Sequence, residues 1–301
     1  MLDRASTFSD PDIIAMLQTR FVPVAVDVWY EERRQDPAGK LYRRIVNQRD
    51  GMRPGRTTQG FYLFTPTGDL LQGWNNRDVR KVKRRLRKAL ASYTPPTSDP
   101  VGAGSLDRRF ERTPPVGAVV VDVFSRIVKA SWPPSQSRWD RVQREATGRD
   151  HLWLLPAEIT EIVAGRWPAT VTRRIARFHV IDNTRGEPPM WRSNEVTAAA
   201  LKLESTADGY RLVGKIQVKS RKGDRGCDAA LLGRVRVKEG RLTRLDIVAR
   251  GSYFGHGRYT GGAPPGSFTL AVAFRLADPK ATSTRVPPQG SRDLNGYLRA
   301  R

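Results

Sequence analysis

The 301 residues of this chain are enough for about two domains, because single hydrophobic cores stop growing at roughly 250–300 residues. A hydrophobic share of 39% and an aromatic share of 8% exclude wholesale disorder, and no uninterrupted apolar run approaches the roughly 18 residues that span a bilayer. The formal net charge of +23 attracts nucleic acid or an anionic membrane surface, but only nonspecifically, because the basic residues are spread along most of the chain.

Cysteine usage and the N-terminus set the expected compartment. Cys227 is the single cysteine, which excludes an internal disulfide, a C-x-x-C motif and a zinc knuckle, and we expect it to be a buried small residue in a strand. The first eight residues show no apolar core followed by a small-residue cleavage site. The sequence as given therefore predicts a cytoplasmic protein, or an exported one if a signal segment precedes Met1.

Two stretches rich in proline, glycine and serine divide the chain. Residues 94–115 read as a linker, and residues 278–301 contain too few apolar side chains to pack and read as a disordered tail. The predicted domains are therefore residues 1–93 and residues 116–277.

The first domain has a mixed α/β pattern. A helix is expected to start at Ser9 or Asp10, and the apolar run Phe21–Val28 predicts a strand covered on both faces. Gly60–Phe64 and Asp69–Trp74 flank a proline–glycine turn and predict a β-hairpin.

A helix from about Asp78 to Tyr93, capped by Asn76, closes this domain, and its outward side is strongly basic. A solvated charged face is the ordinary interpretation, and a phosphate-binding face is the alternative. The residues of this candidate anion or nucleic-acid face are Arg80, Lys81, Arg84, Arg85, Arg87 and Lys88.

The second domain is predicted to be α+β and dominated by antiparallel strands. Strands are expected at Val116–Val128 and His151–Leu154, and short helices after Pro156 and Pro168. From Glu195 onward, alternating segments separated by tight turns predict a β meander, as a barrel or a sandwich. Those strands start near residues 195, 210, 227, 242 and 268.

Two segments of the first domain carry a family resemblance. The residues Ser6 to Ile14, followed by Phe21 to Asp27, resemble the bacterial and spermatogenesis-associated-protein-like branch of the thioredoxin superfamily. Phe61 to Asp69 similarly looks like the third strand of that family and its turn. The resemblance covers about residues 1–93 and implies an α/β thioredoxin-like N-terminal domain.

The resemblance also implies features that this sequence lacks. The family's C-x-x-C motif and the strand before it would fall ahead of Met1, and the family's cis-proline position holds Gln59. In this fold the absent strand lies between Phe21–Val28 and Gly60–Phe64. We therefore expect these two strands to pair with each other or to accept another strand between them, and we favour an upstream start.

Few residue patterns point to a reaction. Asp150-His151 and His179-x-x-Asp182 with Glu187 could assemble a metal or acid–base site, but structural histidines are favoured. The segment from Asp182 to Trp191 reads as a binding loop or, preferably, a structural turn. The loop from Gly255 to Gly262 has the wrong spacing for a nucleotide fingerprint, and its candidate ligand residues are His256, Arg258 and Tyr259.

The resulting functional hypothesis is a redox-silent thioredoxin-like binding or scaffold protein of unknown ligand. One alternative is a thiol–disulfide oxidoreductase whose C-x-x-C segment lies upstream of the given start, and another is nonspecific nucleic-acid binding through the basic helix. We predict no catalytic residue, metal ligand or cofactor in the sequence as given. The sequence leaves the partner unknown: a protein is one candidate, and nucleic acid is a less favoured one.

Overall fold

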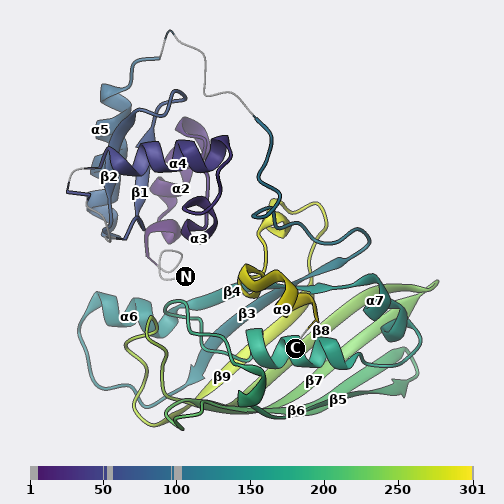
Figure 1. The fold of residues 1–301 in the computed structure, drawn as a ribbon. Coiled ribbons are helices and arrows are strands. Elements are labelled where there is room, and N and C mark those ends of the chain that lie inside the picture. The colour runs from purple at the N-terminus through teal and green to yellow at the C-terminus, as the bar shows by residue number, and fades with distance from the viewer. Residues whose placement is uncertain (1–5, 50, 53–56, 96, 98–103, 300–301) are drawn as a thin grey trace. The chain divides into compact units, whose positions relative to one another are not determined.

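The computed structural model describes residues 6–49, 51–52, 57–95, 97 and 104–299. The chain forms two compact units, and their boundary lies between Glu111 and Arg112 (Figure 1). No helix among these residues is long and apolar enough to cross a membrane.

The N-terminal unit combines helices with a two-stranded antiparallel sheet. In chain order its elements are η1 (Thr7–Ser9), α2 (Pro11–Arg20), α3 (Val28–Glu31), α4 (Pro37–Asn47), β1 (Phe61–Phe64), β2 (Leu70–Trp74) and α5 (Val79–Ser92). Its main buried apolar cluster is small and consists of Ile13, Trp74, Val79, Val82 and Leu86. The mixed composition agrees with the predicted α/β pattern, and the thioredoxin-like assignment stays a prediction.

Local sequence signals explain three of these elements. The Asp10 carboxylate caps α2 by accepting hydrogen bonds from the backbone N–H groups of Asp12 and Ile13. The predicted hairpin is confirmed, because Phe61 of β1 pairs with Trp74 of β2 in antiparallel register. Helix α5 is also confirmed, but its cap is the Asp78 side chain and not Asn76.

The strand predicted at Phe21–Val28 is wrong. Residues 21–27 form no strand, and the side chains of Val22, Val24 and Val26 are 90%, 69% and 52% exposed. No backbone hydrogen bond joins residues 22–26 to another residue that the structure describes. The apolar run therefore neither pairs with β1 nor receives a strand between them from the described chain, because apolar composition alone supplies no partner for a strand.

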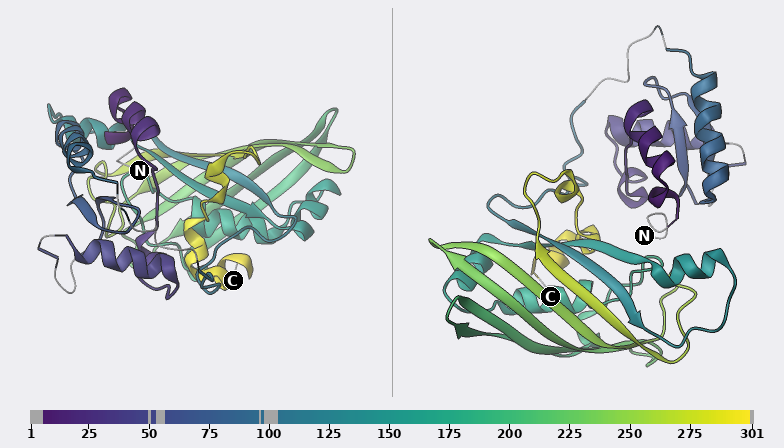
Figure 2. Two further views of the ribbon diagram at one scale, coloured as in Figure 1. Left: turned by 90° about the horizontal axis from the view of Figure 1, so that it is seen from above. Right: turned by 180° about the vertical axis from the view of Figure 1, so that it is seen from behind.

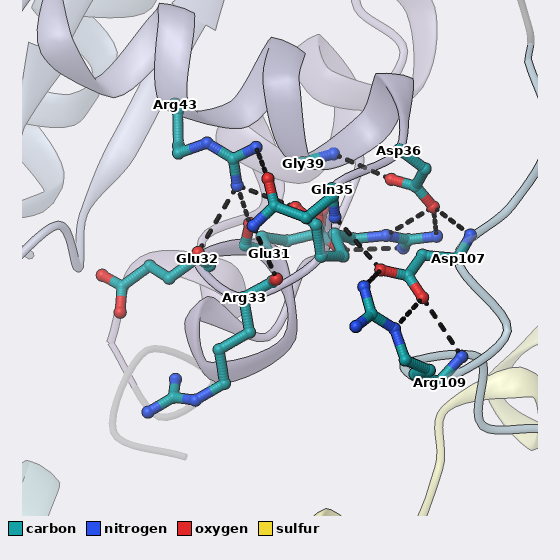
Figure 3. Close-up of polar contacts among 10 residues, drawn as sticks. Glu31, Glu32, Arg33, Gln35, Asp36, Gly39, Arg43, Asp107 and Arg109 are labelled. Atoms are coloured by element: carbon teal, nitrogen blue, oxygen red, sulfur yellow. Dashed lines mark hydrogen bonds and ion pairs between the residues drawn. The ribbon is translucent and has the colours of Figure 1, made fainter.

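A polar network ties the end of the N-terminal unit to the turn before α4 (Figure 3). The Asp36 carboxylate caps α4 at Gly39 N, pairs with Arg34 (2.5 Å) and accepts a hydrogen bond from Asp107 N (2.8 Å). The Asp107 carboxylate in turn accepts from Gln35 N (3.2 Å). Residues 104–111 thus belong to the N-terminal unit, which corrects the predicted linker of 94–115.

The C-terminal unit is built on one seven-stranded antiparallel sheet of order β4-β3-β9-β8-β7-β6-β5. The strands are β3 (Val119–Lys129), β4 (Thr147–Leu154), β5 (Val196–Thr206), β6 (Gly209–Lys219), β7 (Gly226–Lys238), β8 (Arg241–Phe254) and β9 (Ser267–Leu276). Its helices are α6 (Arg138–Glu145), α7 (Pro156–Val163), α8 (Ala169–Arg174), the π-helical turn η2 (Ile175–His179), η3 (Ser193–Glu195), η4 (Thr282–Arg285), η5 (Gln289–Asp293) and α9 (Leu294–Arg299). The predicted meander is confirmed for β5 to β9.

The sheet is open, so the expected barrel or sandwich is wrong. Helices α7 and α8 and the turn η2 lie over one face of the sheet (Figure 1). Buried side chains of these helices, such as Ile162 and Ile175, share one core with Val121, Ile247 and Phe274 of the strands. Because helices already cover this inner face, neither closure nor a second sheet is needed to bury it.

The predicted disordered tail is also corrected, within residues 278–299. These residues form η4, η5 and α9, and Tyr297 is fully buried against Trp153 and Phe178. The Tyr297 hydroxyl accepts a hydrogen bond from Trp153 N (3.2 Å), and the Asp150 carboxylate accepts one from Gln289 N (2.9 Å). The segment therefore packs along β4, an edge strand that would otherwise expose backbone groups.

Candidate functional site

The outward side of α5 is the most strongly charged helix face of the N-terminal unit. Two of its cations are used within the unit: Lys83 pairs with Asp10 (2.9 Å) and Asp12 (2.6 Å), and Arg85 lies over the Trp74 ring at 5.3 Å. Arg85 therefore does not belong to the exposed part of the predicted face. Five predicted residues remain exposed and make no ion pair with any residue that the structure describes: Arg80, Lys81, Arg84, Arg87 and Lys88.

These five residues, which we call the α5 basic face, form a compact cationic surface. A helix rises about 1.5 Å per residue, so Arg80 and Lys88 lie about 12 Å apart along its axis. Arginine stays protonated under all ordinary conditions, and exposed lysine is charged at neutral pH. The opposite side of α5 packs Val82 and Leu86 into the unit's core, which fixes the direction in which the cations point.

The loop from Gly255 to Gly262 is held in place by a buried hydrogen bond of its own. Thr260 is buried, and its hydroxyl accepts a hydrogen bond from Gly257 N (2.7 Å). His256, Arg258 and Tyr259 are all exposed, and the last two lie side by side, with the Arg258 guanidinium 5.4 Å from the Tyr259 ring centre. The three predicted ligand residues therefore share one loop, and all of them are exposed on it.

The segment from Asp182 to Trp191 supplies the support for that loop. Asp182 and Arg185 form a buried ion pair, and Arg185 Nε donates to Gly261 O (3.2 Å). Arg225, which directly precedes β7, donates to Pro189 O (2.8 Å) and lies over the Trp191 ring at 4.0 Å. These contacts agree with a structural turn, which was the preferred interpretation of this segment.

The structure does not bring the histidines and carboxylates of the less favoured metal or acid–base alternative together. His179 faces Asp150 (Nδ1 to Oδ2, 3.4 Å), and His151 faces Asp122 (Nε2 to Oδ1, 3.4 Å). Asp182 is taken by Arg185, and Glu187 pairs with Arg292 (2.8 Å). Within the described ranges, no three His, Cys, Asp or Glu side chains could hold a metal ion together.

Both histidines are buried among structural contacts. His179 packs edge-on against the rings of Phe274 and Tyr297, at 6.0 and 6.5 Å between ring centres. Burial lowers the pKa of His151, and this effect outweighs the opposing one of the nearby Asp150 and Asp122 carboxylates, which would raise it. His151 is therefore neutral at pH 7, and both side chains act as structural histidines.

Cys227 offers no thiol chemistry. It lies buried in β7, as predicted, and burial raises the pKa of its thiol to about 12. Since the thiolate is the nucleophile in disulfide exchange, a thiol held protonated at neutral pH is unreactive. The oxidoreductase alternative depends wholly on a segment ahead of Met1 and stays a prediction.

Sequence reasoning missed the buried ionic contacts of the C-terminal unit. Arg174, fully buried, pairs with Glu158, whose carboxylate also accepts a hydrogen bond from Leu155 N (2.9 Å) at the start of α7. The sequence offered one signal for the contacts of Glu158: it stands at the third position after the helix cap, where a carboxylate can accept from the backbone N–H of the cap. Arg174 carried no signal, because its burial depends on how α8 packs.

Comparison with known proteins returned no match: no protein-family model, no curated protein and no solved structure is similar to this chain.

Proposed function

We propose that this chain is a binding protein and not an oxidoreductase, and that its N-terminal unit contacts the phosphate backbone of nucleic acid through the α5 basic face. The observation that carries this proposal is the set of five exposed cations on α5 that have no ion pair with the described residues. The net charge of +23 supports it, because a strongly basic chain is attracted to polyanions over long range.

The chemistry of the face favours nonspecific backbone contact. Arg and Lys neutralise phosphates and release their counterions, which supplies most of nonspecific nucleic-acid affinity. Arg and Lys can read only guanine among the base edges, and the α5 basic face exposes no Asn or Gln to read adenine, so contacts to the sequence-independent phosphates dominate. We therefore expect little discrimination between sequences.

Salt-dependent binding of the full chain tests the proposal. We would measure fluorescence anisotropy of a labelled 20-base-pair DNA duplex and of an RNA of the same sequence, across a series of salt concentrations. The triple variant Arg84→Glu, Arg87→Glu and Lys88→Glu should bind at least tenfold more weakly. Its slope of log affinity against log salt should fall by about 2 to 3, since each phosphate contact contributes about 0.9.

A variant with the same charge change elsewhere provides the control. Arg126→Glu, Lys215→Glu and Arg250→Glu also reverses two arginines and one lysine, at exposed positions of the C-terminal sheet. If it weakens binding as much as the α5 variant, affinity follows net charge alone and the proposal is wrong. Unchanged binding by the α5 variant would also overturn it.

A further inference from the structure

Among the described residues of the C-terminal unit, no helix lies over strands β6 to β8 on the outer face of the seven-stranded sheet, opposite α7 and α8 (Figure 2). Strand register places side chains of neighbouring strands in rows across this face. One row is apolar over five adjacent strands and consists of Val213, Leu232, Val248, Ala273 and Phe124. Leu232 and Val248, at its centre, are 53% and 48% exposed.

A second row runs beside the apolar one and alternates cations with alanines. Lys215, Ala230, Arg250, Ala271 and Arg126 are consecutive cross-strand neighbours. The three cations of this row are exposed, and none makes an ion pair with a residue that the structure describes. Because strands lie about 4.8 Å apart, cations on every second strand are about 10 Å apart.

The other side of the apolar row is different, because its acidic groups are already paired. Asp122 pairs with Arg275 (3.3 Å), and Asp246 pairs with Arg244. Arg211 and Arg234 on that side are also exposed and form no ion pair with the residues that the structure describes. Both flanks of the apolar row therefore carry cations. Lys215, Arg250 and Arg126 recur on every second strand with no acidic neighbour in their row, whereas the other row mixes arginines with the paired Asp246 and Asp122.

We propose that this face docks an amphipathic α-helix of a partner protein that carries acidic side chains along one flank of its apolar side. Seven residues of an α-helix span about 10.5 Å, so Asp or Glu at every seventh position would meet Lys215, Arg250 and Arg126 in turn. The apolar row crosses five strands, about 19 Å, which corresponds to a helix of about 13 residues. Apolar contact with Leu232 and Val248 supplies affinity, and the cations fix orientation.

Nucleic acid fits this face less well than the α5 basic face. A sugar–phosphate backbone presents charge without a continuous apolar side, so it would leave the apolar row poorly covered. A bilayer is also a poorer occupant, because a twisted sheet cannot lay all three cations on one plane. The combination of an apolar row with flanking cations therefore favours an acidic amphipathic helix.

A designed peptide tests the proposal on the full chain. The probe is a labelled 18-residue helical peptide with leucines on one side and glutamate at every seventh position beside them. A scrambled peptide of the same composition is the control. We expect micromolar binding of the probe by fluorescence anisotropy, and at least tenfold weaker binding of the scrambled peptide.

Two variants locate the contact. Arg126→Glu with Lys215→Glu and Arg250→Glu should weaken probe binding at least tenfold, and so should Leu232→Ser with Val248→Ser. The α5 variant Arg84→Glu, Arg87→Glu and Lys88→Glu carries the same charge change and should bind the probe as the parent does. Amide exchange of β7 and β8, unchanged in all variants, would show that the sheet remains folded.

The outcomes separate this proposal from the nucleic-acid one. Equal binding of both peptides, or equal weakening by both triple variants, overturns the acidic-helix proposal. So does a probe that binds the Leu232→Ser, Val248→Ser variant normally. If duplex DNA or phosphatidylserine vesicles displace the probe and lose affinity in the sheet variant, the face takes a different anionic partner and the proposal is wrong.

Discussion

The two units bury apolar residues in different ways. The C-terminal unit alternates buried and more exposed residues along its central strands, as in β7, and its core runs without interruption from β4 to β6. The N-terminal unit has a five-residue cluster around Trp74 and leaves the apolar run at residues 21–27 largely exposed. An apolar segment is thus buried only where other elements supply a surface to cover it, whatever its own composition.

The largest effect on the free energy of unfolding is expected for a substitution in the C-terminal unit, at Trp191. Its indole is fully buried, donates to Val180 O (2.9 Å) and packs under Arg225. Trp191→Ala should lower the free energy of unfolding of this unit by about 3–5 kcal/mol, because it leaves a large cavity and an unpaired carbonyl. Urea unfolding followed by amide exchange of β7 and β8 measures it. Trp139→Ala, at a side chain 40% exposed, is the control and should cost under about 1 kcal/mol. A smaller cost at Trp191 than at Trp139 would contradict the comparison.

The second largest effect on stability is expected for a substitution in the N-terminal unit, at Asp36. Burial would raise the pKa of its carboxyl, but hydrogen bonds from Arg34, Asp107 N and Gly39 N outweigh burial and lower the pKa to about 2. Asp36→Asn should cost about 2 kcal/mol at pH 7, because it removes a helix cap and a charge-assisted hydrogen bond. Amide exchange across α4 measures this cost.

The same carboxyl makes the N-terminal unit sensitive to acid. The folded pKa lies below the unfolded value of about 3.9, so the contribution of Asp36 is complete above pH 4 and is lost as the pH falls towards 2. The difference between parent and variant should therefore shrink over that window. Asp12→Asn, at a carboxylate 71% exposed, is the control and should change stability by under about 1 kcal/mol. A parent–variant gap that stays constant down to pH 2 would show that Asp36 has no such role.

The smallest effect is expected at Val24, although it is as apolar as a core residue. Val24→Ser should change stability by less than about 0.5 kcal/mol, because the side chain is 69% exposed. Ile13→Ala, at a fully buried side chain of the same unit, should cost about 2–4 kcal/mol. The amides of Val24 and Val26 should exchange rapidly, whereas that of Tyr62 in β1 should be protected. Slow exchange at Val24, or a cost near that of Ile13, would mean that another surface covers this run.

Period-two alternation and turn residues predicted most of the C-terminal sheet. Leu212, Ile216 and Val218 alternate along β6 and are all buried, and the turn at Glu239-Gly240 adopts positive φ at both residues. Such signals are local, since each depends on a few neighbouring residues.

What could not be predicted depends on distant partners. Asp150 reads as a partner of His151 in sequence, but it faces His179, which β4 and η2 bring together. The exposed cations on α5 were predictable from helical periodicity. The stacking of Arg85 over the Trp74 ring was not, because Trp74 lies on the neighbouring strand β2. The cationic row of the outer face required the register of five strands, which no single segment contains.

The order of strands has a consequence for synthesis of the protein. Within the seven-stranded sheet, β3 and β4 leave the ribosome first, but β3 pairs with β9, the last strand made, and β4 is covered by Tyr297. At about 5–20 residues per second, the first two strands wait roughly ten seconds for these partners. A lone strand pair is marginally stable in water, so β3 and β4 are nascent-chain segments that a chaperone would need to shield, while β5 to β8 can pair as they emerge.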